Sequence, residues 1–258
     1  MKTVFYKIIG VLWPLALVGS LVLFTYHSAT KQFEVPSREE ITALNNVDES
    51  SRLKRATLIS RQSAVKVVSL APDNLKVSAG SGTYVTVDNR YFILTMAHGV
   101  NPDCEFVRIV VEGETEDPYK SCKKIIEINV FTDYAIIEVD KINTLSPVSI
   151  MRSVPRNTEW IKSFAPLTSL VYTGHPNNIG ALTIEGQVMG YSEDDHIFMH
   201  SYGWSGASGS GVFNEDGQLV GYVMAILMGE SEHGINVLED VVVVVPLFKV
   251  DWSVVFHR

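Results

Sequence analysis

The chain has 258 residues, of which 46% are hydrophobic and 19% charged, and its formal net charge is −8 at pH 7. This composition can build a hydrophobic core, which excludes a wholly disordered chain. The densest basic stretch, residues 52–55, is too small for a nucleic-acid-binding face, so we expect no nucleic-acid partner. Two cysteines are too few for a disulfide-dense miniprotein or a four-cysteine zinc site.

Residues 8–26 form an uncharged and mostly apolar run of 19 residues. As a helix this run spans about 28 Å, which is close to the hydrocarbon core of a bilayer. A cleaved signal peptide is the alternative, but the apolar run continues beyond the small residues 18–20 that would form its cleavage site. We therefore expect residues 1–29 to be a membrane anchor with one transmembrane helix. The flanking positive charges slightly favour an extracytoplasmic (periplasmic, extracellular or luminal) location for the rest of the chain.

Residues 30–62 are polar and rich in charge. Ser37 can cap the exposed N–H groups at a helix start, and Glu40 stands at the reciprocal position of a capping box. Apolar residues are sparse after Glu40, so we expect a short exposed helix within a spacer that ends at Gln62.

From Ser63 onward, short apolar or alternating runs rich in Val, Ile, Thr, Tyr and Phe recur between turn residues. This pattern is typical of an all-β fold built as barrels or a sandwich. Helical periodicity is nearly absent until residues 247–257, for which we expect a C-terminal helix. The proline-containing stretch 143–167 is the expected connection between two halves.

Cys104 and Cys122 are placed symmetrically about Gly113, at the start of a predicted turn. In an antiparallel hairpin this symmetry brings them within disulfide reach, and the alternative is two buried thiols. A zinc site made from both cysteines and His98 would lack a fourth ligand. We therefore expect no metal and no cofactor.

Three short motifs place a polar residue beside an apolar strand. His98 follows one strand, Asp133 opens another, and Ser208 lies in the glycine-rich segment 206–211. Taken singly, each residue has a structural explanation, as a surface histidine, a turn aspartate and a loop serine.

Taken together, the three residues form a set with a specific chemistry. A serine hydroxyl becomes a nucleophile when an imidazole accepts its proton, and a carboxylate orients that imidazole and stabilises its charged form. Glycines let the main chain aim N–H donors at the developing oxyanion. The order is His, Asp, Ser, with separations of 35 and 75 residues.

These motifs resemble those of the trypsin-like (chymotrypsin-fold) serine peptidases, in particular the compact HtrA-like and glutamyl-endopeptidase-like branches and the small serine proteases of positive-strand RNA viruses. The resemblance covers about residues 63–246. The segments that carry it are Gly80-Ser81-Gly82 with the strand leading to His98, Thr132-Asp133-Tyr134, and Gly206-Ala207-Ser208-Gly209 with the hairpin that follows.

The resemblance implies a protease domain at residues 63–258 with two six-stranded antiparallel β-barrels, at about 63–142 and 160–246. It implies that Ser208 attacks the scissile carbonyl, that His98 acts as base and then acid, and that Asp133 orients His98. The backbone N–H groups of Gly206 and Ser208 would form the oxyanion hole.

The sequence departs from the family pattern at two positions of the nucleophile loop. Ala207 stands where Asp or Asn is usual, and Gly211 stands where Pro is common. Only 50 residues follow Ser208, which leaves no room in this chain for the peptide-binding domain of a full-length HtrA protein.

The same resemblance predicts which segments shape the specificity pocket. These segments are residues 202–205, before the nucleophile, and about residues 222–225, after it. Neither contains Asp or Glu, which argues against a preference for Arg or Lys before the scissile bond. Val223 replaces the histidine of glutamyl endopeptidases, so an apolar or small side chain before the scissile bond is expected; His200 reaching the pocket is an alternative. The predicted substrate-binding residues are Tyr202, Gly203, Trp204, Ser205, Tyr222, Val223 and Met224.

The sequence thus predicts a membrane-anchored serine endopeptidase that acts on protein or peptide substrates. Two alternatives stay open. One is an inactive protease-fold module that binds or scaffolds, and the other is a viral or phage protease that processes its own precursor. The sequence does not indicate an oligomeric state.

Overall fold

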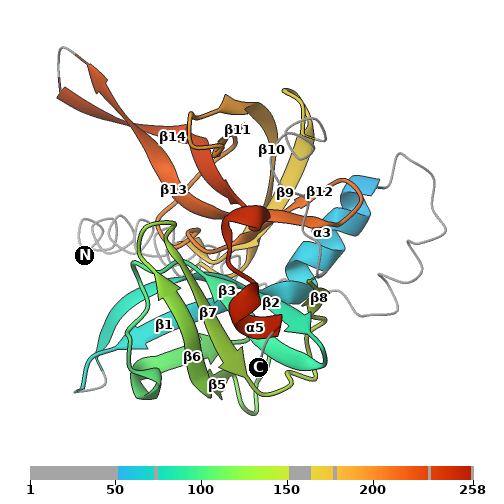
Figure 1. Cartoon of the computed structure of the whole chain (residues 1–258), viewed down its shortest axis with the longest axis vertical. Coiled ribbons are helices and arrows are strands. Elements are labelled where there is room, and N and C mark those ends of the chain that lie inside the picture. Colours follow the sequence, from blue (N-terminus) through green and yellow to red (C-terminus); the bar gives the residue numbers. More distant parts are fainter. Residues whose placement is uncertain (1–51, 73–74, 151–163, 177–178, 232–233, 257–258) are drawn as a thin grey trace, which may run out of the picture. The chain divides into compact units, whose positions relative to one another are not determined.

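The computed structural model of the chain describes residues 52–72, 75–150, 164–176, 179–231 and 234–256 (Figure 1). All of them belong to the second of two compact units, Val35–Arg258. The predicted anchor at residues 1–29 and the predicted helix after Ser37 lie outside the described residues. Within the described ranges, no helix combines the length and apolar character needed to cross a membrane.

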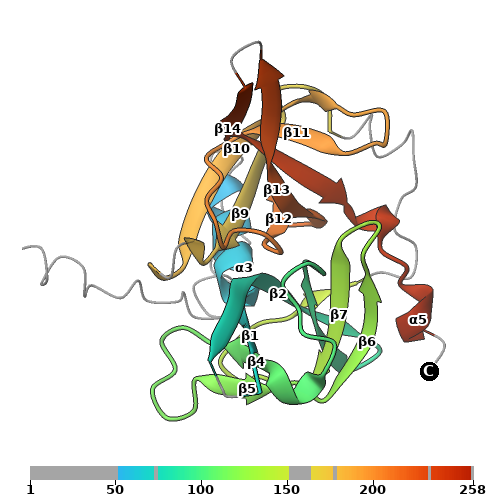
Figure 2. The same cartoon turned by 90° about the vertical axis from the view of Figure 1, so that its left-hand side faces the viewer.

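The first sheet has eight strands and follows the order β5-β4-β1-β2-β3-β7-β6, with β8 parallel to β2 and every other pair antiparallel (Figures 1 and 2). Its strands are β1 (Ala64–Leu70), β2 (Lys76–Val87), β3 (Arg90–Thr95), β4 (Val107–Val110), β5 (Tyr119–Ser121), β6 (Lys124–Asn129), β7 (Tyr134–Val139) and β8 (Val148–Ser149).

The prediction of a closed six-stranded first barrel was wrong, because the edge strands β5 and β6 do not pair within the described sheet. Only Cys122 and Lys123 separate these two strands. Cys122 is bonded to Cys104, and the Lys123 amide donates to the Glu138 carbonyl on β7. The backbone between the two edges is therefore engaged elsewhere, and the sheet stays open.

The second half is a closed six-stranded antiparallel barrel in the order β10-β11-β14-β13-β12-β9. It matches the barrel predicted for residues 160–246. Its strands are β9 (Ser169–Gly174), β10 (Leu182–Tyr191), β11 (Ile197–His200), β12 (Gly211–Asn214), β13 (Leu219–Ser231) and β14 (Gly234–Pro246).

One hydrophobic cluster is shared between the two halves. Fully buried aromatic rings from the first sheet, Phe92 and Tyr134, pack in one cluster with Phe213 and Tyr222 of the barrel. Burial of a large aromatic side chain contributes about 2 kcal/mol through the hydrophobic effect. The cluster therefore holds the two halves together at the place where the predicted catalytic segments meet.

The C-terminal segment is not the single helix predicted for residues 247–257. It forms a 3-10 turn, η5 (Leu247–Lys249), and a four-residue helix, α5 (Ser253–Phe256). The Asp251 amide donates to the Tyr134 hydroxyl, and the Trp252 indole donates to the Leu247 carbonyl. These tertiary bonds replace the i to i+4 bonds that would continue one helix.

The folded domain also extends N-terminal to Ser63, the boundary that the sequence predicts. Helix α3 (Arg52–Ser63) lies beside β9 in both views (Figures 1 and 2). Its Ser60 hydroxyl donates to Thr173 Oγ1 at 2.8 Å. The buried face of α3 includes Ala56, Ser60 and Gln62. This face is mostly polar, so the sequence shows no apolar periodicity that would predict the helix.

Cys104 and Cys122 form a disulfide with a Cα–Cα distance of 5.4 Å and a sequence separation of 18. Cys104 begins a short 3-10 turn, η3 (Cys104–Phe106), and Cys122 follows β5 directly. The bond therefore closes the β4–β5 hairpin at its open end, where Arg108 pairs with Ser121.

Replacing both cysteines with serine is expected to lower the free energy of unfolding by about 3 kcal/mol, because the unfolded chain regains the entropy of a loop of this length. Guanidinium denaturation of the parent and the double variant measures this difference. Equal unfolding midpoints would show that the hairpin is held by its other contacts.

Candidate active site

The strand order brings His98 and Asp133 together, although 35 residues separate them in the sequence. β3 and β7 are antiparallel neighbours in which Thr95 pairs with Ala135. The end of β3 and the start of β7 therefore lie at the same edge of the sheet. His98 lies in the turn after β3, and Asp133 directly precedes β7.

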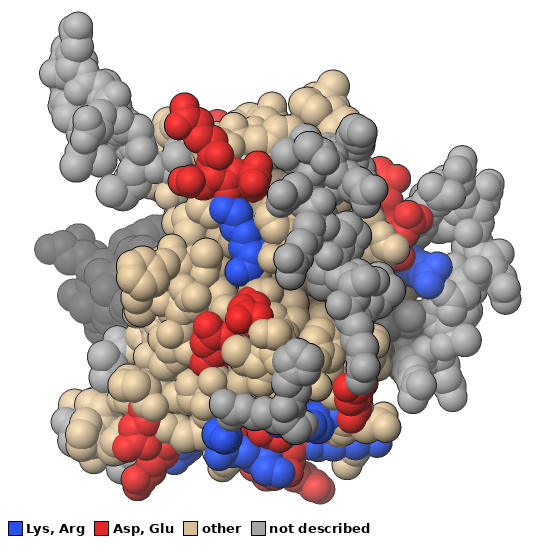
Figure 3. All heavy atoms as spheres, viewed as in Figure 1, with Lys and Arg blue, Asp and Glu red and all other residues tan. Residues whose placement is uncertain are grey.

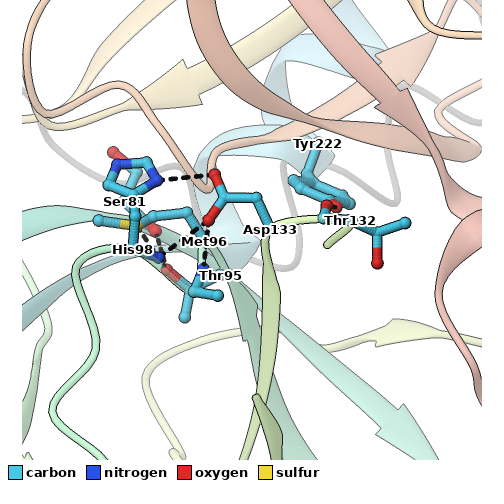
Figure 4. Close-up of polar contacts among 8 residues, drawn as sticks. Ser81, Thr95, Met96, His98, Thr132, Asp133 and Tyr222 are labelled. Carbon is cyan, nitrogen blue, oxygen red and sulfur yellow. Dashed lines mark hydrogen bonds and ion pairs between the residues drawn. The ribbon is translucent and has the colours of Figure 1, made fainter. Parts of the chain in front are cut away.

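Asp133 uses both carboxylate oxygens toward the His98 segment (Figure 4). Oδ2 lies 2.6 Å from His98 Nδ1, and Oδ1 accepts the amides of Ala97 at 3.1 Å and His98 at 2.9 Å. The Asp133 backbone adopts a left-handed φ of 53°, which costs on the order of 1–3 kcal/mol for a non-glycine residue. The carboxylate bonds offset this strain and fix the imidazole plane.

The pKa of His98 is raised above its ordinary value, chiefly by the hydrogen bond to Asp133. Partial burial opposes the increase, and the negative charge of Asp133 adds to it. Because a carboxylate only accepts hydrogen bonds, the neutral imidazole carries its proton on Nδ1. Nε2 is then an acceptor without a partner among the described residues, on a side chain that is 56% exposed.

Ser208 lies in the loop between β11 and β12 of the second barrel. Two successive turns shape this loop, because the Ala207 amide donates to Trp204 and the Ser210 amide donates to Ala207. Gly209 has a φ of 89°, and a Cβ there would lie 2.1 Å from the Ser81 carbonyl oxygen, so only glycine fits. Ala207, the unusual residue of the motif, packs in the barrel core.

Two amide groups of this loop have no acceptor. Within the described residues, the N–H groups of Gly206 and Ser208 donate to no carbonyl or side chain. Gly206 has a left-handed φ of 96°. An oxyanion hole requires backbone N–H groups that donate to no protein acceptor, and these two meet that requirement among the described residues.

Main-chain hydrogen bonds connect the loop that carries Ser208 to a strand of each half of the domain. The Ser81 amide on β2 donates to the Ser208 carbonyl at 2.8 Å, and the Gly209 amide donates to the Val223 carbonyl on β13 at 2.7 Å. The Val223 amide in turn donates to Ser210. Ser208 therefore lies where β2 of the first sheet meets β13 of the barrel.

The structure joins two of the three predicted catalytic side chains. His98 and Asp133 are paired, whereas no hydrogen bond in the described region links the Ser208 hydroxyl to the His98 imidazole. Catalytic hydrogen bonds in unliganded enzymes are often long and tighten when substrate binds.

The predicted substrate-binding residues fall into two groups. Tyr202 is exposed and its ring lies 5.5 Å from that of Trp204, while Ser205 is exposed and Met224 is half-buried. Gly203 is buried beside Ile226 and Val242. The remaining two, Tyr222 and Val223, are buried. The alternative pocket residue His200 is exposed on β11.

Tyr222 does not reach the surface, and this corrects its predicted place among the substrate contacts. Its side chain is fully buried in the shared cluster, and its hydroxyl donates to the Thr132 carbonyl beside Asp133 (Figure 4). Burial raises the pKa of its hydroxyl strongly, so Tyr222 stays a neutral donor. We assign it to packing and to support of the Asp133 turn.

The residue that sequence reasoning missed is Ser81. It lies in the Gly80-Ser81-Gly82 segment that leads to the histidine motif, and its small neighbours allow close backbone approach: a Cβ at Gly80 would lie 3.1 Å from the Ser208 carbonyl oxygen. The two glycines beside this serine predict that another segment approaches the backbone closely, but they do not show which segment it is.

The surface carries both signs of charge. In the face shown in Figure 3, Lys and Arg side chains over the first sheet are interspersed with Asp and Glu side chains. Ion pairs of the first half of the domain include Lys120 with Glu114 and Asp117, and Lys123 with Asp140. This part of the surface therefore presents a mixed field rather than one dominant sign.

Comparison with known proteins gives the family and the fold of the chain. The family model described as "Trypsin-like peptidase domain" matches residues 80–221, more than half of the chain. No curated protein matches significantly. Among solved structures, the serine endoprotease from Yersinia pestis has 19% sequence identity and a TM-score of 0.59, over 81% of this chain and 67% of that chain. At that identity the structural likeness establishes the fold, a chymotrypsin-like arrangement of a barrel and a half-barrel. The chain therefore belongs to the trypsin-like peptidase family and is a serine endopeptidase.

Proposed function

We propose that this peptidase cleaves its substrates with Ser208 as nucleophile, His98 as general base and acid, and Asp133 as the residue that orients His98. The observation that carries the proposal is the 2.6 Å contact between Asp133 Oδ2 and His98 Nδ1. It fixes the tautomer in which Nε2 accepts a proton, and Nε2 is the only ring nitrogen left for a serine hydroxyl.

The chemistry follows from these positions. Ser208 Oγ attacks the scissile carbonyl carbon while its proton moves to His98 Nε2. The carbonyl oxygen gains negative charge and is stabilised by the N–H groups of Gly206 and Ser208. His98 then gives the proton to the leaving amine. Water, deprotonated by His98, hydrolyses the acyl-enzyme and restores Ser208.

We expect an apolar or small side chain before the scissile bond. No acidic residue lies among 202–205 or 222–224. A charged substrate side chain would be desolvated there without a partner.

Residues 8–26 support a membrane anchor, and the protease domain would then face an extracytoplasmic compartment. The Cys104–Cys122 disulfide supports that location, because such bonds persist in oxidising environments.

Replacing Ser208 with alanine is expected to abolish peptide hydrolysis and leave the fold intact, since one hydroxyl is removed from a half-buried site. Hydrolysis of a casein-derived peptide mixture, with circular dichroism as the folding control, measures both. Equal hydrolysis by variant and parent would refute Ser208 as the nucleophile.

The Asp133→Asn variant tests the orienting residue through rate and pH. It is expected to lower kcat/KM by a factor on the order of 10⁴, because the imidazole loses the fixed tautomer. In the parent, activity falls as pH drops through the pKa of His98, which Asp133 raises above its ordinary value. The acid limb of the pH profile should therefore move to lower pH in the variant. An unmoved limb at a near-normal rate would exclude Asp133 from this role.

The anchor proposal is tested by fractionation. The full chain is expected to stay in the membrane pellet after alkaline carbonate extraction, whereas a chain starting at residue 30 should be released. Release of the full chain would show that residues 8–26 do not anchor it.

A further inference from the structure

Ser81 holds the main chain of both residues that offer free N–H groups. Its amide donates to the Ser208 carbonyl at 2.8 Å, and its hydroxyl donates to the Gly206 carbonyl at 2.7 Å. We infer that Ser81 is a positioning residue that sets the two oxyanion-hole donors, an inference that rests on the proposed function.

The direction of the hydroxyl bond is determined by its neighbours. The His175 amide at the end of β9 donates to Ser81 Oγ at 2.8 Å. An amide only donates and a carbonyl only accepts, so the hydroxyl proton is directed to Gly206. Ser81 is fully buried and His175 is 4% exposed, so water does not compete for these bonds.

Ser81 is itself rigid, which makes it suitable as a reference point. It lies within β2, where it pairs with Lys66 of β1, and its carbonyl accepts the Thr95 hydroxyl at 2.6 Å (Figure 4). Glycines allow the close approach: a Cβ on Gly174 would lie 3.0 Å from Ser81 Oγ and 2.3 Å from Ser210 Oγ. The position of Ser81 is therefore set by the sheet and not by the loop.

Gly206 needs an external tether of this kind. At a φ of 96°, without a Cβ, its backbone has the widest conformational freedom of any residue type. The hydroxyl bond fixes the Gly206–Ala207 peptide through its carbonyl, and the Ser81 amide fixes the Ser208–Gly209 peptide through the Ser208 carbonyl. The two peptides that carry the Gly206 and Ser208 N–H groups adjoin these fixed peptides, so their orientation depends on both bonds. Oxyanion donors act only when they lie in hydrogen-bond reach of the charge that develops in the transition state. Loss of the tether should therefore weaken transition-state binding more than substrate binding.

Ser60 provides the matched control. It is 2% exposed, and its hydroxyl also makes one buried hydrogen bond, to Thr173 Oγ1 at 2.8 Å. That bond fastens α3 to β9 and does not touch the nucleophile loop. Ser60→Ala and Ser81→Ala thus each remove a buried hydroxyl. The Ser60 hydroxyl makes one hydrogen bond and the Ser81 hydroxyl makes two, and only the Ser81 hydroxyl is bonded to Gly206.

The experiment compares kcat, KM and peptide-aldehyde affinity in the full-length parent, Ser81→Ala and Ser60→Ala. An aldehyde forms a hemiacetal with the serine, and the new oxygen occupies the oxyanion site. Ser81→Ala is expected to lower kcat on the order of 10- to 100-fold with KM changed about twofold at most, and to weaken aldehyde binding by the same factor as kcat/KM. Ser60→Ala should lower the melting temperature similarly and keep the parental kcat.

Three outcomes overturn one claim or the other. Equal kcat in Ser81→Ala and Ser60→Ala, with parental hydrolysis that depends on Ser208, overturns the inference and leaves the proposed function standing. A loss confined to KM overturns it as well, because it would place Ser81 in substrate binding. A parent without Ser208-dependent hydrolysis overturns the proposed function and the inference together.

Discussion

The close approach of β2 to the loop before β12 is the contact on which the candidate site depends. The first sheet supplies His98 and Asp133, and the barrel supplies Ser208 and the two free N–H groups. Neither half contains a complete set. The bonds from Ser81 to the loop place the two sets beside one another, and the shared aromatic cluster holds the halves at that distance.

The proposed catalytic residues lie on turns, while the strands beside them are held in sheets. β3 and β7 are buried and fully paired, so the turns at their ends are fixed at both sides. Asp133 adopts a strained backbone, and bonds from the Ala97 and His98 amides offset that strain. Strain of this kind persists only where the surrounding structure over-determines it. The pair is therefore pre-organised before substrate arrives.

Sequence patterns predicted the second barrel, the family and the meeting of His98 with Asp133, because each depends on strands with strong periodicity or on local motifs. They missed α3, because a helix that buries serine and glutamine shows no apolar stripe. They wrongly predicted a closed first barrel. Whether the sheet closes depends on the partners that Cys122 and Lys123 bond to, and a local pattern does not show those partners. They placed Tyr222 among the residues of the specificity pocket, whereas its ring is buried in the shared cluster, because a strand residue shows only that it alternates and not which face is covered.

The role of Ser81 could not be predicted from the sequence, for a similar reason. A serine between two glycines predicts close backbone approach, but its partners lie 94, 125 and 127 residues away, at His175, Gly206 and Ser208. Such long-range bonds arise from the packing of two sheets, and no local pattern encodes them.

The central claim is that Ser208 is activated by His98, and fluorophosphonate labelling tests it most directly. The full-length protein is labelled, and mass spectrometry locates the modified residue. We expect a single label on Ser208 that is lost in His98→Ala. Folded protein that takes no label, or label on Ser208 that persists at the same rate without His98, would contradict it.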